Sequence, residues 1–142
     1  MNGAKHVFLV DDDDIYMFLM NRMVKKFPFV EKVSLFGNGR KAIEHIEENK
    51  TRPELLPDLI FLDLFMPDLD GWEFLRRFSD AAPMLNKKIG LYVLSSSVSP
   101  HDYDRAKSIT AVTDFIIKPV GKETFLSIVE SLKTVDNGSM TQ

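Results

Sequence analysis

Five short apolar runs, separated by amphipathic segments, constrain the fold of this chain more than any other feature of its sequence. The runs are Val7–Val10, Val33–Phe36, Leu59–Leu62, Ile89–Leu94 and Phe115–Ile117. A run such as Leu59–Leu62 lacks polar alternation, which is typical of strands that are covered on both faces. The pattern therefore predicts five parallel strands joined by helices, that is, a doubly wound α/β domain.

The segments between the runs carry apolar residues at helical spacing, which predicts four helices that each bury one face. The predicted buried faces are Ile15, Phe18, Leu19 and Met23; Ala42, Ile43 and Ile46; Phe74, Leu75 and Phe78; and Phe125, Ile128, Val129 and Leu132. A weaker pattern over Pro100–Ser108, with Ala106 turned inward, predicts a fifth helix.

Length and composition fit a single small domain. A chain of 142 residues can bury a core of its own, and we place this domain at residues 5–134, with flexible termini at 1–4 and 135–142. The sequence has no cysteine, so a bound metal has to be held by oxygen or imidazole ligands. The net charge of -3 comes without a basic stripe, which argues against direct nucleic-acid binding.

The start of the chain argues against a membrane or secretory segment. The apolar run Val7–Val10 is followed at once by four aspartates, Asp11–Asp14, which neither a signal peptide nor a membrane span tolerates. We therefore expect a cytoplasmic protein without membrane insertion.

Polar residues follow four of the five predicted strands. They are Asp11–Asp14 after the first strand, Asp63 at the third, Ser95–Ser97 after the fourth and Lys118-Pro119 after the fifth. In an open parallel sheet the carboxyl ends of the strands form the ligand-binding edge. These residues are therefore predicted to gather at one site.

The predicted site combines carboxylates with groups that bind phosphate. Asp11, Asp12 and Asp63 would repel one another and raise each other's pKa, so a cation is needed beside them. Mg²⁺, or Mn²⁺ in its place, suits an all-oxygen site and shares phosphate oxygens. Lys118 adds a positive charge and Ser95 a hydroxyl donor. The set of groups indicates phosphoryl transfer.

Each of these residues also has an ordinary structural explanation. An aspartate after a strand often caps the next helix, and Asp13 or Asp14 is expected to do so. Ser95–Ser97 alone could be a polar turn, and Lys118 a solvated lysine at a strand end. Asp63 is different, because it interrupts an apolar run in which an unpaired charge would be costly. Only the combination is specific.

At these residues the chain resembles the receiver domains of two-component response regulators, the CheY-like family. The likeness spans about Lys5–Thr134. It rests on four motifs that together are highly specific: Val10-Asp11-Asp12; Leu62–Pro67 followed by Asp70-Gly71, a turn signal; Leu94-Ser95-Ser96; and Phe115–Pro119.

The resemblance implies a flavodoxin-like sheet of strand order 2-1-3-4-5 with five helices. It implies that Asp63 is the phosphoacceptor, the nucleophile that takes a phosphoryl group from a partner's phosphohistidine. Asp12, Asp63 and the backbone carbonyl of Phe65 would be direct metal ligands, and Asp11 would act mainly through water.

The same resemblance assigns the remaining residues of the site. Lys118 would contact the phosphoryl oxygens, Ser95 would move toward them, and Phe115 would rotate inward as the second switch residue; ordinary core packing is the alternative for Phe115. The Lys118-Pro119 peptide bond would be cis. Phe65 and Ser97 occupy positions that influence access of water to the acyl phosphate, which suggests that the Phe65 side chain slows self-hydrolysis.

We therefore expect a stand-alone response regulator that takes its phosphoryl group from a sensor histidine kinase or a histidine phosphotransfer protein. Since no DNA-binding module follows Thr134, the output is expected to be contact with a downstream protein, at a face near the fourth helix, fifth strand and fifth helix, or onward transfer of phosphate. Self-catalysed phosphorylation and dephosphorylation are the only chemistry expected, without turnover of a substrate.

Two other classes of protein fit part of the pattern. An α/β phosphohydrolase that uses Mg²⁺ also has an aspartyl nucleophile at a strand end, but its acid/base aspartate lies two residues further on, where this chain has Phe65. A flavodoxin-like cofactor binder needs a loop rich in Ser, Thr and Gly after the first strand. The four aspartates found there would repel an anionic cofactor.

Overall fold

The computed structural model describes residues 4–66, 69–96 and 99–140. Strands and helices alternate along the chain in the following order: β1 (His6–Val10), α1 (Asp14–Lys25), β2 (Lys32–Phe36), α2 (Gly39–Glu48), β3 (Leu59–Asp63), α3 (Gly71–Ala81), β4 (Gly90–Ser95), α4 (Pro100–Lys107), β5 (Asp114–Ile117) and α5 (Lys122–Met140). Short 3₁₀ helices, η1 (Pro53–Leu55) and η2 (Ala82–Met84), precede β3 and β4. The predicted strands are confirmed, each bound differing by at most one residue.

The five strands form one parallel sheet in the order β2-β1-β3-β4-β5, which confirms the predicted flavodoxin-like topology. The order reverses direction between β1 and β3. All five carboxyl ends therefore point to the same edge of the sheet, and loops leave that edge on both sides of the reversal.

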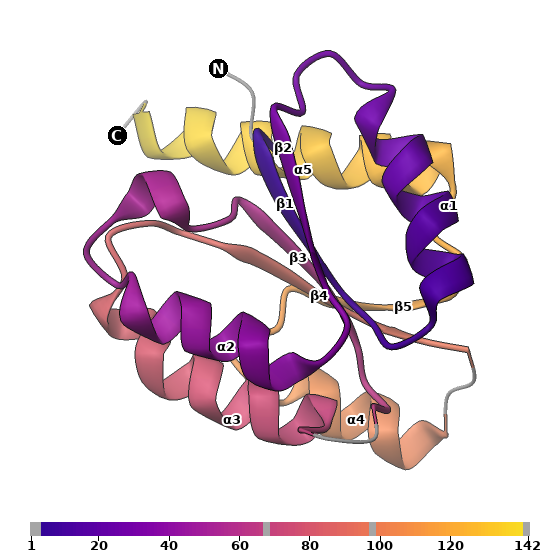
Figure 1. Ribbon diagram of the computed structural model, residues 1–142. Coiled ribbons are helices and arrows are strands. Elements are labelled where there is room, and N and C mark those ends of the chain that lie inside the picture. Colours follow the sequence, from indigo (N-terminus) through magenta and orange to yellow (C-terminus); the bar gives the residue numbers. More distant parts are fainter. Residues whose placement is uncertain (1–3, 67–68, 97–98, 141–142) are drawn as a thin grey trace.

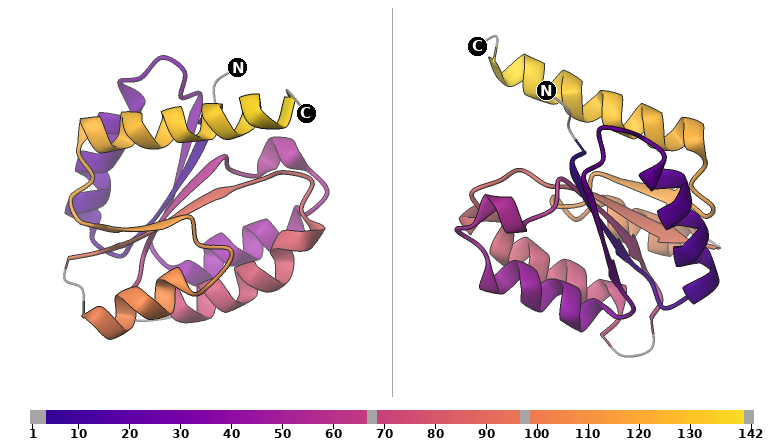
Figure 2. Two further views of the ribbon diagram at one scale, coloured as in Figure 1. Left: turned by 180° about the vertical axis from the view of Figure 1, so that it is seen from behind. Right: turned by 45° about the horizontal axis from the view of Figure 1, so that its top comes forward.

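Side chains of the central strands alternate between two cores. Val7 and Leu9 of β1 pack with α1 and α5, whereas Phe8 and Val10 pack with α2, α3 and α4. Figures 1 and 2 show the resulting layers, with α1 and α5 on one face of the sheet and the other three helices on the opposite face. Both faces of β1, β3 and β4 are buried, which explains their continuous apolar runs.

Side-chain caps begin four of the helices just beyond the carboxyl ends of the strands. Each cap accepts a hydrogen bond from a backbone N–H three residues later, which satisfies one of the free donors of the first turn. The pairs are Asp13 with Tyr16, Asn38 with Lys41, Asp70 with Glu73, and Ser99 with Asp102. The expected capping role of Asp13 is confirmed.

The predicted inner face of the first helix is wrong except at Met23, which is partly buried and packs against the core. Ile15, Phe18 and Leu19 are 74%, 59% and 57% exposed, and the residues that α1 buries are Met17, Met20 and Val24. The helix carries apolar side chains around most of its circumference, so spacing alone does not identify the face that meets the sheet. The predicted inner faces of α2, α3 and α5 are confirmed, as is Ala106 in α4.

α5 continues to Met140, six residues past the boundary predicted at Thr134; the flexibility of the termini stays a prediction. Pro67 and Ser97, which the sequence analysis singled out, lie outside the described residues. In the part of the chain that is described, no helix combines the length and apolar character needed to cross a bilayer.

Candidate functional site

The polar residues predicted from strand ends do meet at the carboxyl edge of the sheet. Asp63 and Ser95 are the last residues of β3 and β4, while Asp11 and Lys118 directly follow β1 and β5. Asp11 is 3% and Asp63 7% exposed, and Ser95 is also buried. Buried polar groups of this kind need partners, and for the two aspartates these are backbone amides of their own loops and the ammonium of Lys118.

Three carboxylates form the centre of the site. One oxygen from each of Asp11, Asp12 and Asp63 lies within 4.8 Å of the others. Asp12 is exposed, so the group opens to solvent on one side. Backbone amides orient the two buried carboxylates, because the N–H of Asp13 donates to Oδ1 of Asp11 at 2.9 Å and the N–H of Phe65 donates to Oδ1 of Asp63 at 3.2 Å.

The environment of Asp63 disfavours its charged form. Burial, together with the negative charge of Asp11, raises the pKa of Asp63 to about 6, although Lys118 acts in the opposite direction. The carboxylate is therefore a stronger base than an ordinary aspartate, and a cation that binds beside it stabilises its charged form.

These residues fit a divalent metal ion. Two of the oxygens come from adjacent residues after β1 and the third from the end of β3; all three lie within 4.8 Å of one another, and the carboxylate of Asp12 is exposed to solvent. A hard cation such as Mg²⁺ is held by such a small set of carboxylates and keeps several waters. Asp11, Asp12 and Asp63 would hold it; the predicted contribution of the Phe65 carbonyl stays a prediction.

Lys118 supplies the positive charge of the site. Its Nζ lies 2.8 Å from Oδ2 of Asp11 and 3.8 Å from Oδ2 of Asp63. Burial alone would lower the pKa of Lys118, but the hydrogen bond and the charge of Asp11 outweigh burial, so the pKa is raised. Lys118 is thus a permanent cation at neutral pH.

One residue of the site, Tyr16 in the first turn of α1, was not predicted from the sequence. Nζ of Lys118 lies 4.5 Å from the centre of the Tyr16 ring. The Tyr16 hydroxyl accepts a hydrogen bond from the N–H of Val120 at 3.4 Å. No local motif marks this residue, since its contacts are made with a loop more than a hundred residues away.

Of the two predicted switch residues, Ser95 ends β4 at the edge that carries the site, and Phe115 lies within β5, three residues before Lys118. Phe115 in β5 is buried, and its ring centre lies 5.8 Å from that of Tyr103 in α4. The Lys118-Pro119 bond is cis, as expected. The movements predicted for Ser95 and Phe115 stay predictions, as does the effect of Phe65, whose side chain is 51% exposed beside Asp63.

The loop that follows Asp63 is closed by Gly71. The N–H of Gly71 donates to the carbonyl of Leu64 at 2.9 Å, and a Cβ on Gly71 would lie 2.5 Å from that carbonyl oxygen. Glycine is required here by this close approach, which brings the start of α3 against the residue after Asp63. The turn predicted at Asp70-Gly71 is thereby confirmed.

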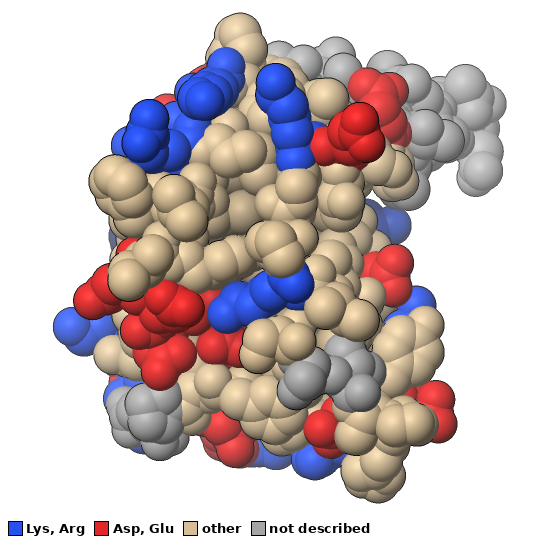
Figure 3. Space-filling view, turned by 90° about the vertical axis from the view of Figure 1, so that its right-hand side faces the viewer, with Lys and Arg blue, Asp and Glu red and all other residues tan. Residues whose placement is uncertain are grey.

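The surface at this edge is acidic. Figure 3, which views the molecule from the right of Figure 1, shows acidic side chains gathered at one place, with a basic side chain beside them.

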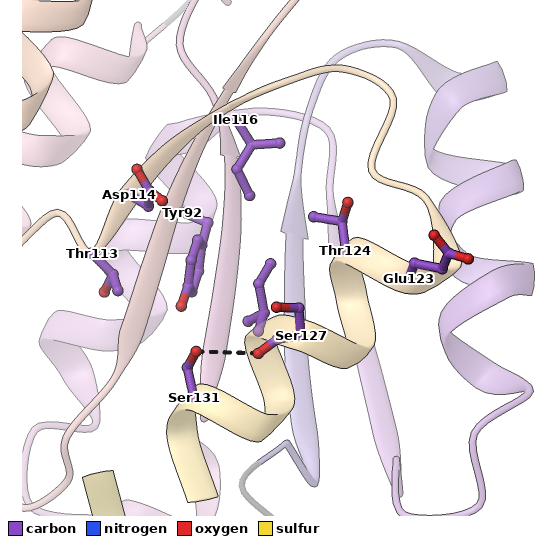
Figure 4. Close-up of a pocket in the computed structure, with 9 residues that line it drawn as sticks. Tyr92, Thr113, Asp114, Ile116, Glu123, Thr124, Ser127 and Ser131 are labelled. Carbon is purple, nitrogen blue, oxygen red and sulfur yellow. Dashed lines mark hydrogen bonds between the residues drawn. The ribbon is translucent and has the colours of Figure 1, made fainter. Parts of the chain in front are cut away.

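A separate hollow of about 490 Å³ lies between β5 and α5 (Figure 4). Its lining includes Tyr92, Asp114 and Ser127, and none of the residues of the acidic site contributes to it.

Comparison with known proteins gives one consistent family. The model of the response regulator receiver domain matches residues 7–130 of this chain. A crystal structure of a two-component response regulator from Cytophaga hutchinsonii is 29% identical, has a TM-score of 0.81, and aligns over 92% of this chain and 98% of the other.

The curated relatives differ widely in length. A probable methanogenesis regulatory protein, FilR2, of Methanothrix harundinacea is 28% identical over 127 residues, which are 89% of this chain and 80% of the relative. The 3',5'-cyclic-nucleotide phosphodiesterase regA of Dictyostelium discoideum is 28% identical over 117 residues; 82% of this chain aligns with 14% of that protein. The matched region thus makes up most of the first relative and a small part of the second.

Proposed function

This chain belongs to the response regulator receiver domain family, and from that membership we propose that it is a phosphorylation-dependent signalling protein whose acceptor is Asp63. In this proposal the protein is a stand-alone receiver that turns over no substrate. Phosphorylation of Asp63 changes its contacts with a target protein. The observation that carries it is the position of Asp63, buried at the end of a central strand between two further aspartates and a lysine.

The proposed reaction is transfer from a phosphohistidine. An Oδ atom of Asp63 attacks the phosphorus, a P–O bond forms as the P–N bond breaks, and the imidazole leaves and takes up a proton. The raised pKa of Asp63 supports its role as nucleophile. When bound, Mg²⁺ would neutralise charge on the phosphoryl oxygens. Lys118, 3.8 Å from Asp63, is within reach of the same oxygens.

The surface of α1 supports a protein as the phosphodonor. Ile15, Phe18 and Leu19 leave an apolar side of this helix exposed, next to the loop that carries Asp11 and Asp12. Exposed apolar residues beside a reactive group are typical of a protein-binding surface. A sensor histidine kinase or histidine phosphotransfer protein that rests on α1 would bring its phosphohistidine to Asp63.

The proposed output face is formed by α4, β5 and α5. Phe115 links this face to the site, because it lies three residues before Lys118 and contacts Tyr103 of α4. Phosphorylation would shift an existing equilibrium of these elements through Ser95 and Phe115. The hollow between β5 and α5 in Figure 4 offers a shaped, partly polar surface to a target protein.

The two rival functions receive less support. Phe65 occupies the position where a phosphohydrolase of this architecture has its acid/base aspartate, and its side chain cannot transfer a proton. An anionic cofactor would meet Asp11, Asp12 and Asp63 at the loop where its phosphate should bind. Neither obstacle applies to an aspartyl phosphoacceptor.

Intact mass measured after incubation with acetyl phosphate tests the proposal. We expect a gain of one phosphoryl group that requires Mg²⁺ and is abolished in Asp63→Asn. Asp58→Asn is the matched control, since Asp58 is also paired with a lysine, Lys87 at 3.1 Å, but lies just before β3 at the opposite edge. A wild-type protein that gains no mass with acetyl phosphate or phosphoramidate would overturn the proposal.

A further inference from the structure

We propose that Tyr16 is a positioning residue that holds the ammonium of Lys118 in place for the phosphoryl group, an inference that rests on the function proposed above. Tyr16 belongs to α1 and Lys118 to the loop that leads from β5 to α5, so the contact joins the first helix to a loop near the other end of the chain. Three observations support this role: the ring contact, the hydrogen bond of the hydroxyl, and the way in which the Tyr16 backbone is fixed.

The ammonium of Lys118 makes a cation–π contact with the ring of Tyr16. Nζ of Lys118 lies 4.5 Å from the ring centre, within the distance at which a cation is attracted to an aromatic face. The side chain of Lys118 is only 13% exposed, so water weakens this attraction less than at an open surface. An aliphatic side chain at position 16 would fill the space without this attraction.

The hydroxyl of Tyr16 holds the backbone next to Lys118. It accepts the N–H of Val120 at 3.4 Å, two residues beyond Lys118. The same side chain therefore contacts both the tip of the lysine and the loop from which the lysine extends. Because the stem of a lysine is long and flexible, two restraints at opposite ends limit the positions that its ammonium can take.

Tyr16 is itself placed by the residues of the acidic loop. Its backbone N–H donates to Oδ1 of Asp13 at 3.0 Å, and the N–H of Asp13 donates to Oδ1 of Asp11. A short chain of hydrogen bonds thus runs from the carboxylate of Asp11 to the start of α1 and so to the ring. The position of the ring relative to the carboxylates is fixed by the same turn that carries them.

A neutral ring has a specific advantage at this place. Asp11 now binds Lys118 at 2.8 Å, yet Asp11 is also one of the three carboxylates suited to a metal ion. An aspartate that turns toward a metal ion gives up part of its hold on the lysine. The ring does not compete for that ion, so it keeps Lys118 near Asp63 without neutralising the charge that phosphoryl oxygens require.

Two variants separate the ring from the rest of the side chain. Tyr16→Phe keeps the ring and removes the hydroxyl, whereas Tyr16→Leu keeps an apolar side chain and removes the ring. The first measurement is the NMR shift of the Lys118 side-chain methylene protons in metal-free protein, assigned by their loss in Lys118→Met. We expect an upfield ring-current shift in wild type and in Tyr16→Phe, and its loss in Tyr16→Leu.

The second measurement is the rate constant of phosphorylation by acetyl phosphate at saturating Mg²⁺. Tyr16→Leu should lower it about two- to tenfold, the range expected for one cation–π contact, and Tyr16→Phe should lower it less. In a Lys118→Met background, Tyr16→Leu should cause no further loss, because the ring acts through the lysine. A role in folding alone would lower the rate equally in both backgrounds.

The outcomes separate this inference from the proposed function. Lys118 methylene shifts that are the same in wild type and Tyr16→Leu, or equal loss of rate with and without Lys118, would overturn the role of Tyr16 and leave the acceptor function intact. A wild type that is never phosphorylated would contradict the function, and the NMR shifts would still decide whether Tyr16 holds Lys118.

Discussion

Nζ of Lys118 lies 3.8 Å from Oδ2 of Asp63, too far for a strong hydrogen bond but close enough for a substantial electrostatic attraction. Its shorter contact, at 2.8 Å, is with Asp11. The lysine therefore acts on Asp63 mainly as a nearby charge and not through a short hydrogen bond to Oδ2.

Replacing Lys118 should change the titration of Asp63. Lys118 lowers the pKa of Asp63, so Lys118→Gln should raise that pKa further above its present value of about 6. Carboxyl ¹³C NMR of Asp63 across a pH titration measures this directly in metal-free protein. Lys107→Gln is the matched control, since Lys107 pairs with Asp114 on the surface and should leave Asp63 unchanged. An unaltered titration in Lys118→Gln would contradict the proposed charge relationship.

The pKa of Asp63 also predicts how stability depends on pH. A carboxyl whose pKa is raised on folding favours the folded state below its unfolded pKa of about 4, and that benefit is lost as pH rises through about 6. In EDTA, Asp63→Asn should therefore be more stable than wild type at pH 7.5, by about 2 kcal/mol. The difference should disappear near pH 3.5.

Urea unfolding at both pH values measures this difference. Added Mg²⁺ should stabilise wild type more than Asp63→Asn, because the variant lacks one carboxylate of the proposed metal site. A variant that is less stable than wild type at pH 7.5 in EDTA would show that the charged form of Asp63 does not destabilise the folded protein.

Closure of the loop after Asp63 should depend on the glycine at position 71. Gly71→Ala places a methyl group 2.5 Å from the carbonyl oxygen of Leu64, so the start of α3 has to move. We expect a loss of about 2 kcal/mol or more. Gly37→Ala has no atom within 4 Å of the new methyl group and should change stability by less than about 1 kcal/mol. Equal changes in the free energy of unfolding for the two substitutions, measured by urea unfolding, would contradict the prediction that position 71 requires glycine.

The exposed ring of Phe65 should lengthen the life of the phosphorylated state. It lies two residues after Asp63 and is half exposed, in a position to exclude water from the acyl phosphate. Phe65→Asn should accelerate loss of the phosphoryl group about tenfold or less, which intact mass follows over time. The same change at Met84, an exposed residue of η2, serves as control. An unchanged lifetime in Phe65→Asn would remove this role.

The acidic loop illustrates how much of the site could be predicted before the structure. Asp11, Asp63, Ser95 and Lys118 could be found because each directly follows an apolar run of the sequence, and parallel strands bring their carboxyl ends to one edge. Their distances could not be predicted. The 2.8 Å contact between Lys118 and Asp11 depends on the geometry of the loop after β5, and no spacing in the sequence reports it.

Local apolar patterns of short period were enough to predict the five strands, their alternation with helices and the polar residues at the strand ends. The side of α1 that meets the sheet and the contact of Tyr16 with Lys118 became known only from the folded protein. The mutual rise in pKa of the carboxylates was expected from the sequence, but the burial of Asp63, which is the larger cause of its raised pKa, is seen only in the folded protein. Each of these features depends on contacts between residues far apart in the chain. Such contacts are set by the packing of whole helices and strands.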